Sequence, residues 1–336
     1  MALVAVTDTG GLDFAPGIAA LRAAGHQVEM IGADSAVDVR DRAENADALV
    51  VSFVEIDAAT IAALPRLAVI ATTTVGLDQV DLAAAREAGV EVRGLPPLAS
   101  EEVATHALAG ILAMTRELAA AQAATSEWDF TRIPPPPRLS ELTLGLYGLG
   151  QIGRQLAVRA LPLFGRVVAF DPHAAQDTWP AGVERVADAD VLFGASNVVS
   201  LHAPATPATR HAVDARTLGL MPPGGYVVNV ARGELVDSAA LLDALDAGHL
   251  RGAFLDVVEP EPPGPGHPLL THPRTIVTPH AAFHSAASAR AYVMGAVANV
   301  LDVLAAATTA TTTDNTTETE SISSAGRAGA VPQEQP

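Results

Sequence analysis

The chain has 336 residues, 49% of them hydrophobic, and is therefore long enough for two domains with buried cores. Its formal net charge of -18 at pH 7 disfavours nucleic acid and anionic membranes as partners, because both bind clustered cations. All twenty basic residues are arginine and cysteine is absent, which excludes lysine Schiff bases, disulfides and cysteine-bound metals.

Five short apolar runs alternate with alanine-rich helical stretches between Leu3 and about Arg93. This alternation predicts βαβ units and a parallel sheet. The chain enters the first run directly, so we expect no targeting segment and a cytoplasmic location. No uncharged apolar run approaches the roughly 20 residues of a membrane span, so we expect no membrane-spanning segment and no membrane partner. The predicted strands occupy residues 3–6, 27–32, 47–52, 67–73 and 90–94.

A long helical pattern follows at residues 100–124, with Ser100 as its expected N-cap. His106 lies among alanine and leucine in this pattern, and we interpret it as a packed or capping residue. Four consecutive prolines at 134–137 exclude helix and predict a loop. Trp128 and Phe130 are expected either to anchor the loop that precedes these prolines or to approach a neighbouring subunit.

Six further strands are predicted in the second half, with helical segments between them. This is the pattern of a doubly wound dinucleotide-binding domain. A final helix is expected at about 285–306, and the segment 307–336 should be disordered because it has few aromatic and apolar residues. The six strands are predicted at 142–147, 166–170, 197–201, 226–230, 252–256 and 275–278.

The sequence "LYGLGQIGRQ" places Gly148, Gly150 and Gly153 in G-x-G-x-x-G order between a predicted strand and a predicted helix. The first glycine permits a tight turn, the second lets a pyrophosphate approach the backbone, and the third permits close helix–sheet packing. Asp171 ends the next predicted strand, where a carboxylate can bind the ribose hydroxyls and repel a 2′-phosphate. The pattern therefore predicts NAD rather than NADP as the cofactor.

Ionisable residues follow the remaining predicted strands, namely His202, Arg232, Asp256 and His280. Ligands of open α/β sheets bind beyond the carboxyl ends of the strands, so these side chains should surround the cofactor. Carbonyl reduction needs a proton donor, which histidine can be at neutral pH, and an arginine can bind a carboxylate bidentately. A glutamate bonded to the histidine would favour imidazolium, and Glu259 and Glu261 are equivalent candidates. We find no cluster of metal ligands and expect no metal.

Several segments together resemble the D-isomer-specific 2-hydroxyacid dehydrogenase family. They occur in the order and with the spacing of that family, and the likeness extends from about Leu3 to Leu304. The resemblance implies a catalytic trio of Arg, Glu and His, which falls on Arg232, Glu261 and His280. The segments are "YGLGQIGRQ", "FDP", "SLHAPATPATRHAV", "VVNVARGELVD", "GAFLDVVEPEP" and "TPHAAFHS".

The resemblance implies two doubly wound α/β domains, with a Rossmann NAD-binding domain inserted into a smaller flavodoxin-like substrate domain. The substrate domain would comprise residues 1–98 and 282–306, the NAD-binding domain residues 99–281, and the disordered tail residues 307–336. A homodimer joined mainly through the cofactor domains is also implied.

The resemblance further assigns ligand contacts. The backbone N–H groups of Val75 and Gly76 would bind the substrate carboxylate together with Arg232, and Gln79 stands where the family more often has Asn. Phe283 would contact the substrate. The predicted cofactor contacts are Gly148, Gly150, Gln151, Ile152, Gly153, Asp171, His202, Pro204, Thr209, Val230, Ala231, Arg232, Asp256 and His280.

Two segments, "ASEEVATHALAGIL" and "PHAAFHSAAS", are similar to the branch that contains the C-terminal-binding-protein corepressors and their bacterial dehydrogenase relatives. In that branch an aromatic residue follows the catalytic histidine by three residues, as Phe283 does here. The next position is often Tyr, whereas this chain has His284. This departure leaves the polarity of the pocket, and hence the substrate, open.

The leading hypothesis is an NAD-dependent oxidoreductase that interconverts a 2-oxoacid and a D-2-hydroxy acid. His280 would be the acid/base, Glu261 would keep it protonated for reduction, and Arg232 would orient the substrate carboxylate. The alternative is an NAD-sensing interaction protein of the corepressor kind, with little or no turnover. A third hypothesis keeps the fold but oxidises a phosphorus or one-carbon acid.

Overall fold

The computed structural model describes the backbone of residues 1–324 and the side chains of residues 1–306. The chain divides into two compact units: unit 1 comprises Met1–Leu98 and Ala286–Pro336, and unit 2 comprises Ala99–Ser285. The predicted boundary after residue 98 coincides with this division, and the predicted return at 282 lies shortly before the observed one. The helix predicted at about 285–306 continues to Ser324, so the backbone of residues 307–324 is helical where disorder was expected. The predicted disorder of residues 325–336 lies outside the described residues and stays a prediction.

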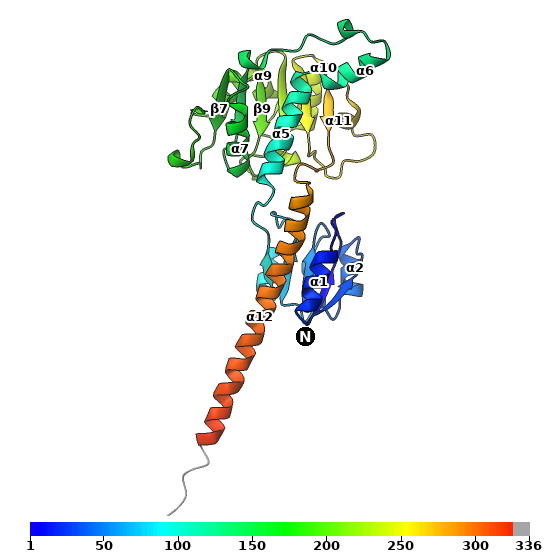
Figure 1. The fold of residues 1–336 in the computed structure, drawn as a ribbon, viewed down its shortest axis with the longest axis vertical. Helices are drawn as coiled ribbons and strands as arrows, with labels where there is room; N and C mark the ends of the chain where they lie inside the picture. Colours follow the sequence, from blue (N-terminus) through cyan, green and yellow to red (C-terminus); the bar gives the residue numbers. More distant parts are fainter. Residues whose placement is uncertain (325–336) are drawn as a thin grey trace, which may run out of the picture. The chain divides into compact units, whose positions relative to one another are not determined.

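Unit 1 is built on a five-stranded parallel sheet with the order β2-β1-β3-β4-β5. This order is that of flavodoxin-like folds, as predicted. Helices α2, α3 and α4 cover one face of the sheet, and α1 and α12 lie together over the other (Figure 1). The strands are β1 (Leu3–Val6), β2 (Gln27–Met30), β3 (Ala48–Val51), β4 (Val69–Thr72) and β5 (Glu91–Arg93), and the helices are α1 (Ala15–Ala23), α2 (Ala36–Arg42), α3 (Ala58–Ala63), α4 (Leu82–Glu87) and α12 (Ala286–Ser324).

Among the helices of the described residues, one segment of α12, residues 286–306, would suit a membrane span by length and composition alone. One side of this segment is buried in the core of unit 1 through Val293, Val297 and Val300. Gly17 of α1 permits this close packing, since a Cβ there would lie 2.8 Å from the Val293 side chain and 3.0 Å from that of Val297. Packing within unit 1 therefore accounts for the apolar composition of the segment.

Unit 2 is built on a seven-stranded parallel sheet with the order β12-β11-β10-β9-β6-β7-β8. The chain adds β7 and β8 on one side of β6 and then β9 to β12 on the other, so the topological switch point lies between β6 and β9. Helices α5 and α7 cover one face, and α8, α9 and α10 cover the other (Figure 1).

The strands of unit 2 are β6 (Thr143–Tyr147), β7 (Arg166–Phe170), β8 (Glu184–Arg185), β9 (Val198–Leu201), β10 (Gly225–Asn229), β11 (Leu250–Leu255) and β12 (Thr275–Val277). Its α-helices are α5 (Ser100–Thr115), α6 (Leu118–Ala123), α7 (Gln151–Ala160), α8 (Ala189–Ala195), α9 (Ala215–Leu220), α10 (Ser238–Asp246) and α11 (Pro268–Thr271). Short 3-10 helices are η1 (Ala124–Ser126), η2 (Phe130–Arg132), η3 (Leu139–Glu141), η4 (Gln176–Thr178) and η5 (Gly233–Leu235).

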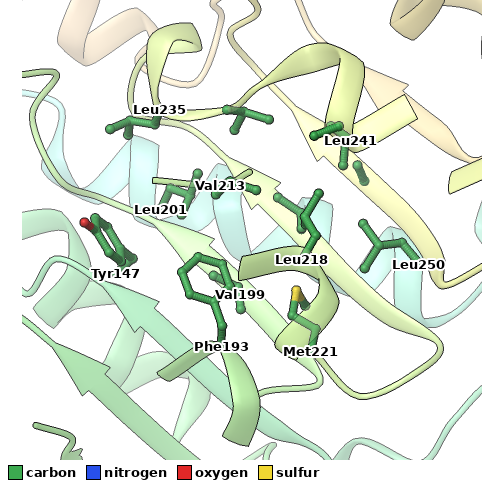
Figure 2. Packing of buried hydrophobic residues seen from close by; sticks show 14 of the residues in the cluster. Tyr147, Phe193, Val199, Leu201, Val213, Leu218, Met221, Leu235, Leu241 and Leu250 are labelled. Carbon is green, nitrogen blue, oxygen red and sulfur yellow. The ribbon is translucent and has the colours of Figure 1, made fainter. Parts of the chain in front are cut away.

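The central strands of unit 2 are nearly continuous apolar runs because both faces of the sheet are covered by helices. Every residue of β9 and β10 is buried. Figure 2 shows one of the two core clusters of this unit, in which Tyr147 and Phe193 pack near Val199, Leu201 and Leu218. The ring centroids of Tyr147 and Phe193 are 6.3 Å apart. This packing fixes the carboxyl ends of the strands, where the candidate site lies.

The helix predicted at 100–124 is interrupted at Glu117, where φ is 54°. The Glu117 carboxylate accepts a hydrogen bond from the guanidinium of Arg251 on β11, a partner distant in the sequence. Ala99, not Ser100, is the N-cap residue of α5, and it makes no side-chain hydrogen bond. The prediction of one continuous helix capped by Ser100 is therefore wrong.

The two-residue strand β8 is absent from the six strands predicted for this part of the chain. Its residues, Glu184 and Arg185, are charged and exposed, so they give no apolar run. Pairing with β7 creates the strand, and an ion pair of 2.6 Å between Arg166 and Glu184 accompanies this pairing. The other six strands are confirmed with shifts of up to two residues at their ends.

Candidate functional site

The glycine loop joins the end of β6 to the start of α7. Gly148 has φ of 99°, and a Cβ there would lie 2.7 Å from the backbone nitrogen of Ala203. A Cβ on Gly153 would lie 2.4 Å from the carbonyl oxygen of Gly148, whereas one on Gly150 would meet open space. Packing therefore requires the first and third glycines, while the second leaves room beside the free N–H groups of the first turn of α7. This geometry fits a dinucleotide pyrophosphate.

Asp171 follows β7 and binds the glycine loop. Its Oδ2 accepts a hydrogen bond of 2.7 Å from the backbone N–H of Leu149. Its Oδ1 accepts bonds of 2.8 Å and 3.0 Å from the N–H groups of His173 and Ala174. The carboxylate thus sets the position of the loop, and any ribose hydroxyl would share it with these backbone donors.

His202 follows β9 and lies under the glycine loop. Its Nε2 is 2.9 Å from the hydroxyl of Ser200, and its backbone lies where a side chain on Gly148 would be. The residue as a whole is partly exposed, but its Nδ1 is buried and has no hydrogen-bond partner among the described residues. Burial lowers the pKa of His202 to about 3, so the ring is neutral at physiological pH.

The turn after β10 is shaped by the fully buried Asn229. Its Nδ2 donates to the carbonyl of Arg232 at 2.8 Å, and its Oδ1 accepts from the N–H of Ala231 at 3.0 Å. Arg232 donates to the carbonyl of Ala231 at 2.8 Å and has no carboxylate within ion-pair distance among the described residues. Its guanidinium therefore keeps donors for an anionic ligand. The sequence placed Asn229 at a strand end but assigned it no role.

Several of the other predicted cofactor residues make contacts within the protein itself. The hydroxyl of Thr209 donates to the carbonyl of Pro204 at 2.6 Å and so closes its own loop. Val230 is buried in the core of unit 2. Gln151 and Ile152 open α7; the amide oxygen of Gln151 lies 3.3 Å from the Ser100 hydroxyl, and Ile152 packs against the core.

Asp256, after β11, is only 2% exposed and anchors the loop that follows β12. Its Oδ1 accepts hydrogen bonds from the hydroxyl of Thr278 and from the N–H of Ala281 at 2.8 Å. Its Oδ2 accepts from the N–H of Ala282 at 2.9 Å. His106 of α5, which the sequence indicated only as packed or capping, lies 3.1 Å from the Thr278 hydroxyl and 3.5 Å from Asp256.

The electrostatics of Asp256 follow from these contacts. Burial alone would raise its pKa, but the hydrogen bonds from His106, Thr278 and the two backbone N–H groups outweigh burial and lower it. Asp256 is thus an ionised structural anchor. A nicotinamide amide would have to share a carboxylate that already accepts several hydrogen bonds.

His280 and Glu261 form a direct pair, in which His280 Nδ1 contacts Glu261 Oε1. Their side chains are 39% and 40% exposed, so a ligand can reach them. The backbone N–H of His280 donates to the carbonyl of Asp256 at 2.8 Å, which connects the pair to the anchor. The ring of Phe283 lies edge-on to His280, with 6.5 Å between centroids. The pairing leaves Nε2 of His280 for another partner.

A cavity of about 370 Å³ lies beside the pair in unit 2. Its walls combine the apolar side chains of Val258 and Val277 with the polar groups of Asp256, Glu261 and His280. A mostly apolar hollow with a few convergent polar groups is typical of a small-molecule site.

Glu259 and Glu261, which the sequence alone left equivalent, have different partners. Glu259 pairs with Arg210 at 2.7 Å and with His211 at 3.5 Å, and it makes no contact with His280 among the described contacts. The hydrogen bond from Arg210 is the main reason that the pKa of Glu259 is lowered, against the effect of its burial. Glu261 is therefore the glutamate available to His280.

In unit 1, the predicted substrate loop follows β4. The amide of Gln79 donates to the hydroxyl of Thr74 at 3.0 Å and to the carbonyl of Ser52 at 3.1 Å, which ties the loop to the end of β3. No described hydrogen bond uses the N–H groups of Val75 and Gly76 as donors. These N–H groups are thus free to bind an anion. Within the described residues, no group of three or more His, Asp or Glu side chains could hold a metal ion.

Comparison with known proteins gives one consistent family. Residues 108–282 match the model of the D-isomer specific 2-hydroxyacid dehydrogenase, NAD binding domain. A D-3-phosphoglycerate dehydrogenase of Mycobacterium tuberculosis is 40% identical over 242 residues, which cover 70% of this chain and 45% of that enzyme. The aligned part thus spans less than half the length of that relative.

Two further similarities cover more of the related protein. A glyoxylate reductase of Thermofilum pendens is 36% identical over 239 residues, covering 68% of this chain and 69% of that enzyme. The crystal structure of a Thermus thermophilus protein superposes with a TM-score of 0.82 at 36% identity, covering 90% of this chain and 97% of that one. Neither similarity tests the predicted corepressor-like branch, which stays a prediction.

The anchoring role of Asp256 predicts that Asp256→Asn destabilises unit 2. An amide cannot accept all the bonds that the carboxylate accepts, so we expect a loss of about 1–3 kcal/mol at pH 7 in urea unfolding. Because the folded-state pKa is lowered, the carboxylate stabilises above its unfolded pKa of about 3.9 and this contribution is lost as pH falls through the folded pKa. The difference between wild type and variant should therefore shrink below about pH 4.

The matched control is Asp177→Asn, because Asp177 is exposed on the same unit. It should unfold like the wild type at every pH. Equal stability of Asp256→Asn and Asp177→Asn at pH 7 would contradict the anchoring role.

Proposed function

This chain belongs to the D-isomer specific 2-hydroxyacid dehydrogenase family, and we propose that it interconverts a 2-oxoacid and a D-2-hydroxy acid with NAD as cofactor. The observation that supports this most strongly is the His280–Glu261 pair, which opens on a cavity at the same sheet edge as the dinucleotide loop. A proton donor and a cofactor site are what carbonyl reduction needs.

We assign the proton transfer to His280. With Nδ1 bonded to Glu261, Nε2 can donate a proton to the carbonyl oxygen, and the negative Glu261 stabilises the imidazolium that donates it. When bound, the reduced nicotinamide supplies the hydride that the carbonyl carbon accepts. In the reverse direction Nε2 accepts the hydroxyl proton.

We assign substrate binding to the free donors on each unit. Arg232 of unit 2 would bind the carboxylate bidentately and polarise the adjacent carbonyl. On unit 1, the N–H groups of Val75 and Gly76 are likewise proposed to bind a substrate carboxylate. Phe283, edge-on to His280, would contact the substrate carbon chain.

We assign the cofactor to the glycine loop and the strand ends beside it. The free N–H groups at the start of α7 would bind the pyrophosphate beside Gly150. The space next to Gly150 is open, and the absence of a side chain there lets the phosphates approach the backbone. Asp171 would bind the ribose hydroxyls and repel a 2′-phosphate, which favours NAD over NADP.

The proposed chemistry predicts that His280→Ala loses turnover but keeps NADH binding. Removing the acid should lower kcat by about 100-fold or more, while the glycine loop is untouched. NADH and NADPH oxidation should be followed with glyoxylate, hydroxypyruvate, 3-phosphohydroxypyruvate, 4-methyl-2-oxopentanoate and phenylpyruvate, and NADH binding by calorimetry. His26→Ala, on unit 1, is the control and should retain wild-type turnover.

Equal turnover of His280→Ala and wild type would refute the acid/base assignment. Tight NADH binding by the wild type without turnover of any acid would instead favour the cofactor-sensing interaction protein.

We also propose a homodimer formed through unit 2. Trp128 and Phe130 are 89% and 81% exposed, so they do not anchor the preceding loop in this chain and instead present two large apolar surfaces. Single exposed apolar residues are common on protein surfaces, whereas exposed apolar groups close together are typical of interaction sites, and these two aromatics are only two residues apart in the chain.

The dimer predicts that the double substitution Trp128→Ser and Phe130→Ser yields a monomer in light scattering coupled to size-exclusion chromatography. Val37→Ser, at an exposed apolar residue of unit 1, should leave the mass unchanged. A monomeric wild type, or a double variant that remains dimeric, would rule out this interface.

A further inference from the structure

Three loops that follow neighbouring strands of unit 2 meet around Glu259, two of them at its carboxylate and the third through its backbone. The loop after β11 contains Glu259 itself, two residues before Glu261. Its Oε1 pairs with the guanidinium of Arg210 at 2.7 Å, and its Oε2 lies 3.5 Å from His211 Nε2. Arg210 and His211 belong to the segment after β9, so this cluster connects the loops after β9 and β11.

The loop after β10 is held in the same junction by its backbone. The N–H of His211 donates to the carbonyl of Glu234 at 2.8 Å, and an isolated β-bridge joins Val213 to Val236. These contacts fix the segment after β9 against η5, which begins directly after Arg232.

Gly233 closes the junction on its third side. It is buried, and a Cβ at this position would lie 2.5 Å from the carbonyl carbon of Val258 and 2.6 Å from the backbone nitrogen of Glu259. The backbones after β10 and β11 are therefore in direct contact, next to Arg232 on one side and Glu261 on the other.

We propose that Glu259 is a positioning residue, which holds the Glu261 loop in register with Arg232 so that Glu261 meets His280. This inference rests on the function proposed above. Glu259 makes no described contact with His280 or with the cavity, so it acts through the backbone between it and Glu261.

The exposure of the Glu259 ion pairs indicates that they position the loop and add little to the stability of the fold. The side chains of Arg210, His211 and Glu259 are 52%, 42% and 32% exposed. Ion pairs this exposed contribute little to the free energy of unfolding. A small displacement of a catalytic group, in contrast, can lower the rate strongly. Loss of the pair should therefore change turnover more than stability.

The test compares Glu259→Gln, Arg210→Gln and their double variant with the wild type. Each single variant should lower kcat roughly 10-fold, with NADH affinity and the thermal midpoint little changed. The double variant should lose no more than either single one, because both remove the same interaction. Arg210→Lys keeps the charge and should retain most of the turnover.

Hydrogen exchange provides a readout that does not depend on activity. The amides of segment 257–263 that carry a hydrogen, which are those of Val257, Val258, Glu259 and Glu261, should exchange faster in Glu259→Gln than in the wild type. The control is Glu184→Gln, which breaks another exposed Arg–Glu pair of unit 2, at β8, and it should leave both kcat and exchange at 257–263 unchanged.

The possible outcomes separate the two proposals. If the wild type turns over a 2-oxoacid and Glu259→Gln has the same kcat, the positioning role is overturned. Additive losses in the double variant would also overturn it, because the two residues would then act independently. A wild type that turns over no 2-oxoacid, while Glu259→Gln loosens 257–263, would refute the proposed function but support the junction.

Discussion

The seven strands of unit 2 are all parallel, and this constraint places every carboxyl end at one edge of the sheet. Residues far apart in the sequence are therefore neighbours: Gly148 follows β6, Arg232 follows β10 and His280 follows β12. The central strands are buried on both faces, which fixes their register and hence the positions of their carboxyl ends. The proposed cofactor binding and the proposed acid–base chemistry would thus depend on the same packing.

Asp256 holds the loop after β12, which carries His280, at this edge of the sheet. Its buried carboxylate accepts hydrogen bonds from Thr278, Ala281 and Ala282, and these residues surround His280 on both sides. The exposed pair of His280 and Glu261 is therefore supported by a buried anion. Polar residues buried and bonded in this way fix a geometry as well as contributing stability.

Apolar periodicity and glycine spacing were enough to predict the strands, the glycine loop and the ionisable residues at the strand ends. Contacts between distant segments were not predictable in this way. The break at Glu117 coincides with a contact to Arg251 on β11, and the charged strand β8 is defined by its pairing with β7. The glutamates at 259 and 261 have the same local sequence, and only their partners in space, Arg210 and His280, distinguish them.

The most direct test of the account is the stereochemistry of the product. Because the glycine loop and His280 are fixed on one sheet edge, hydride and proton should reach the substrate carbonyl from fixed directions. Chiral chromatography of the hydroxy acid formed from NADH and a 2-oxoacid with a chiral product, such as hydroxypyruvate or phenylpyruvate but not glyoxylate, should show the D isomer alone. The L isomer or a racemic product would contradict the account.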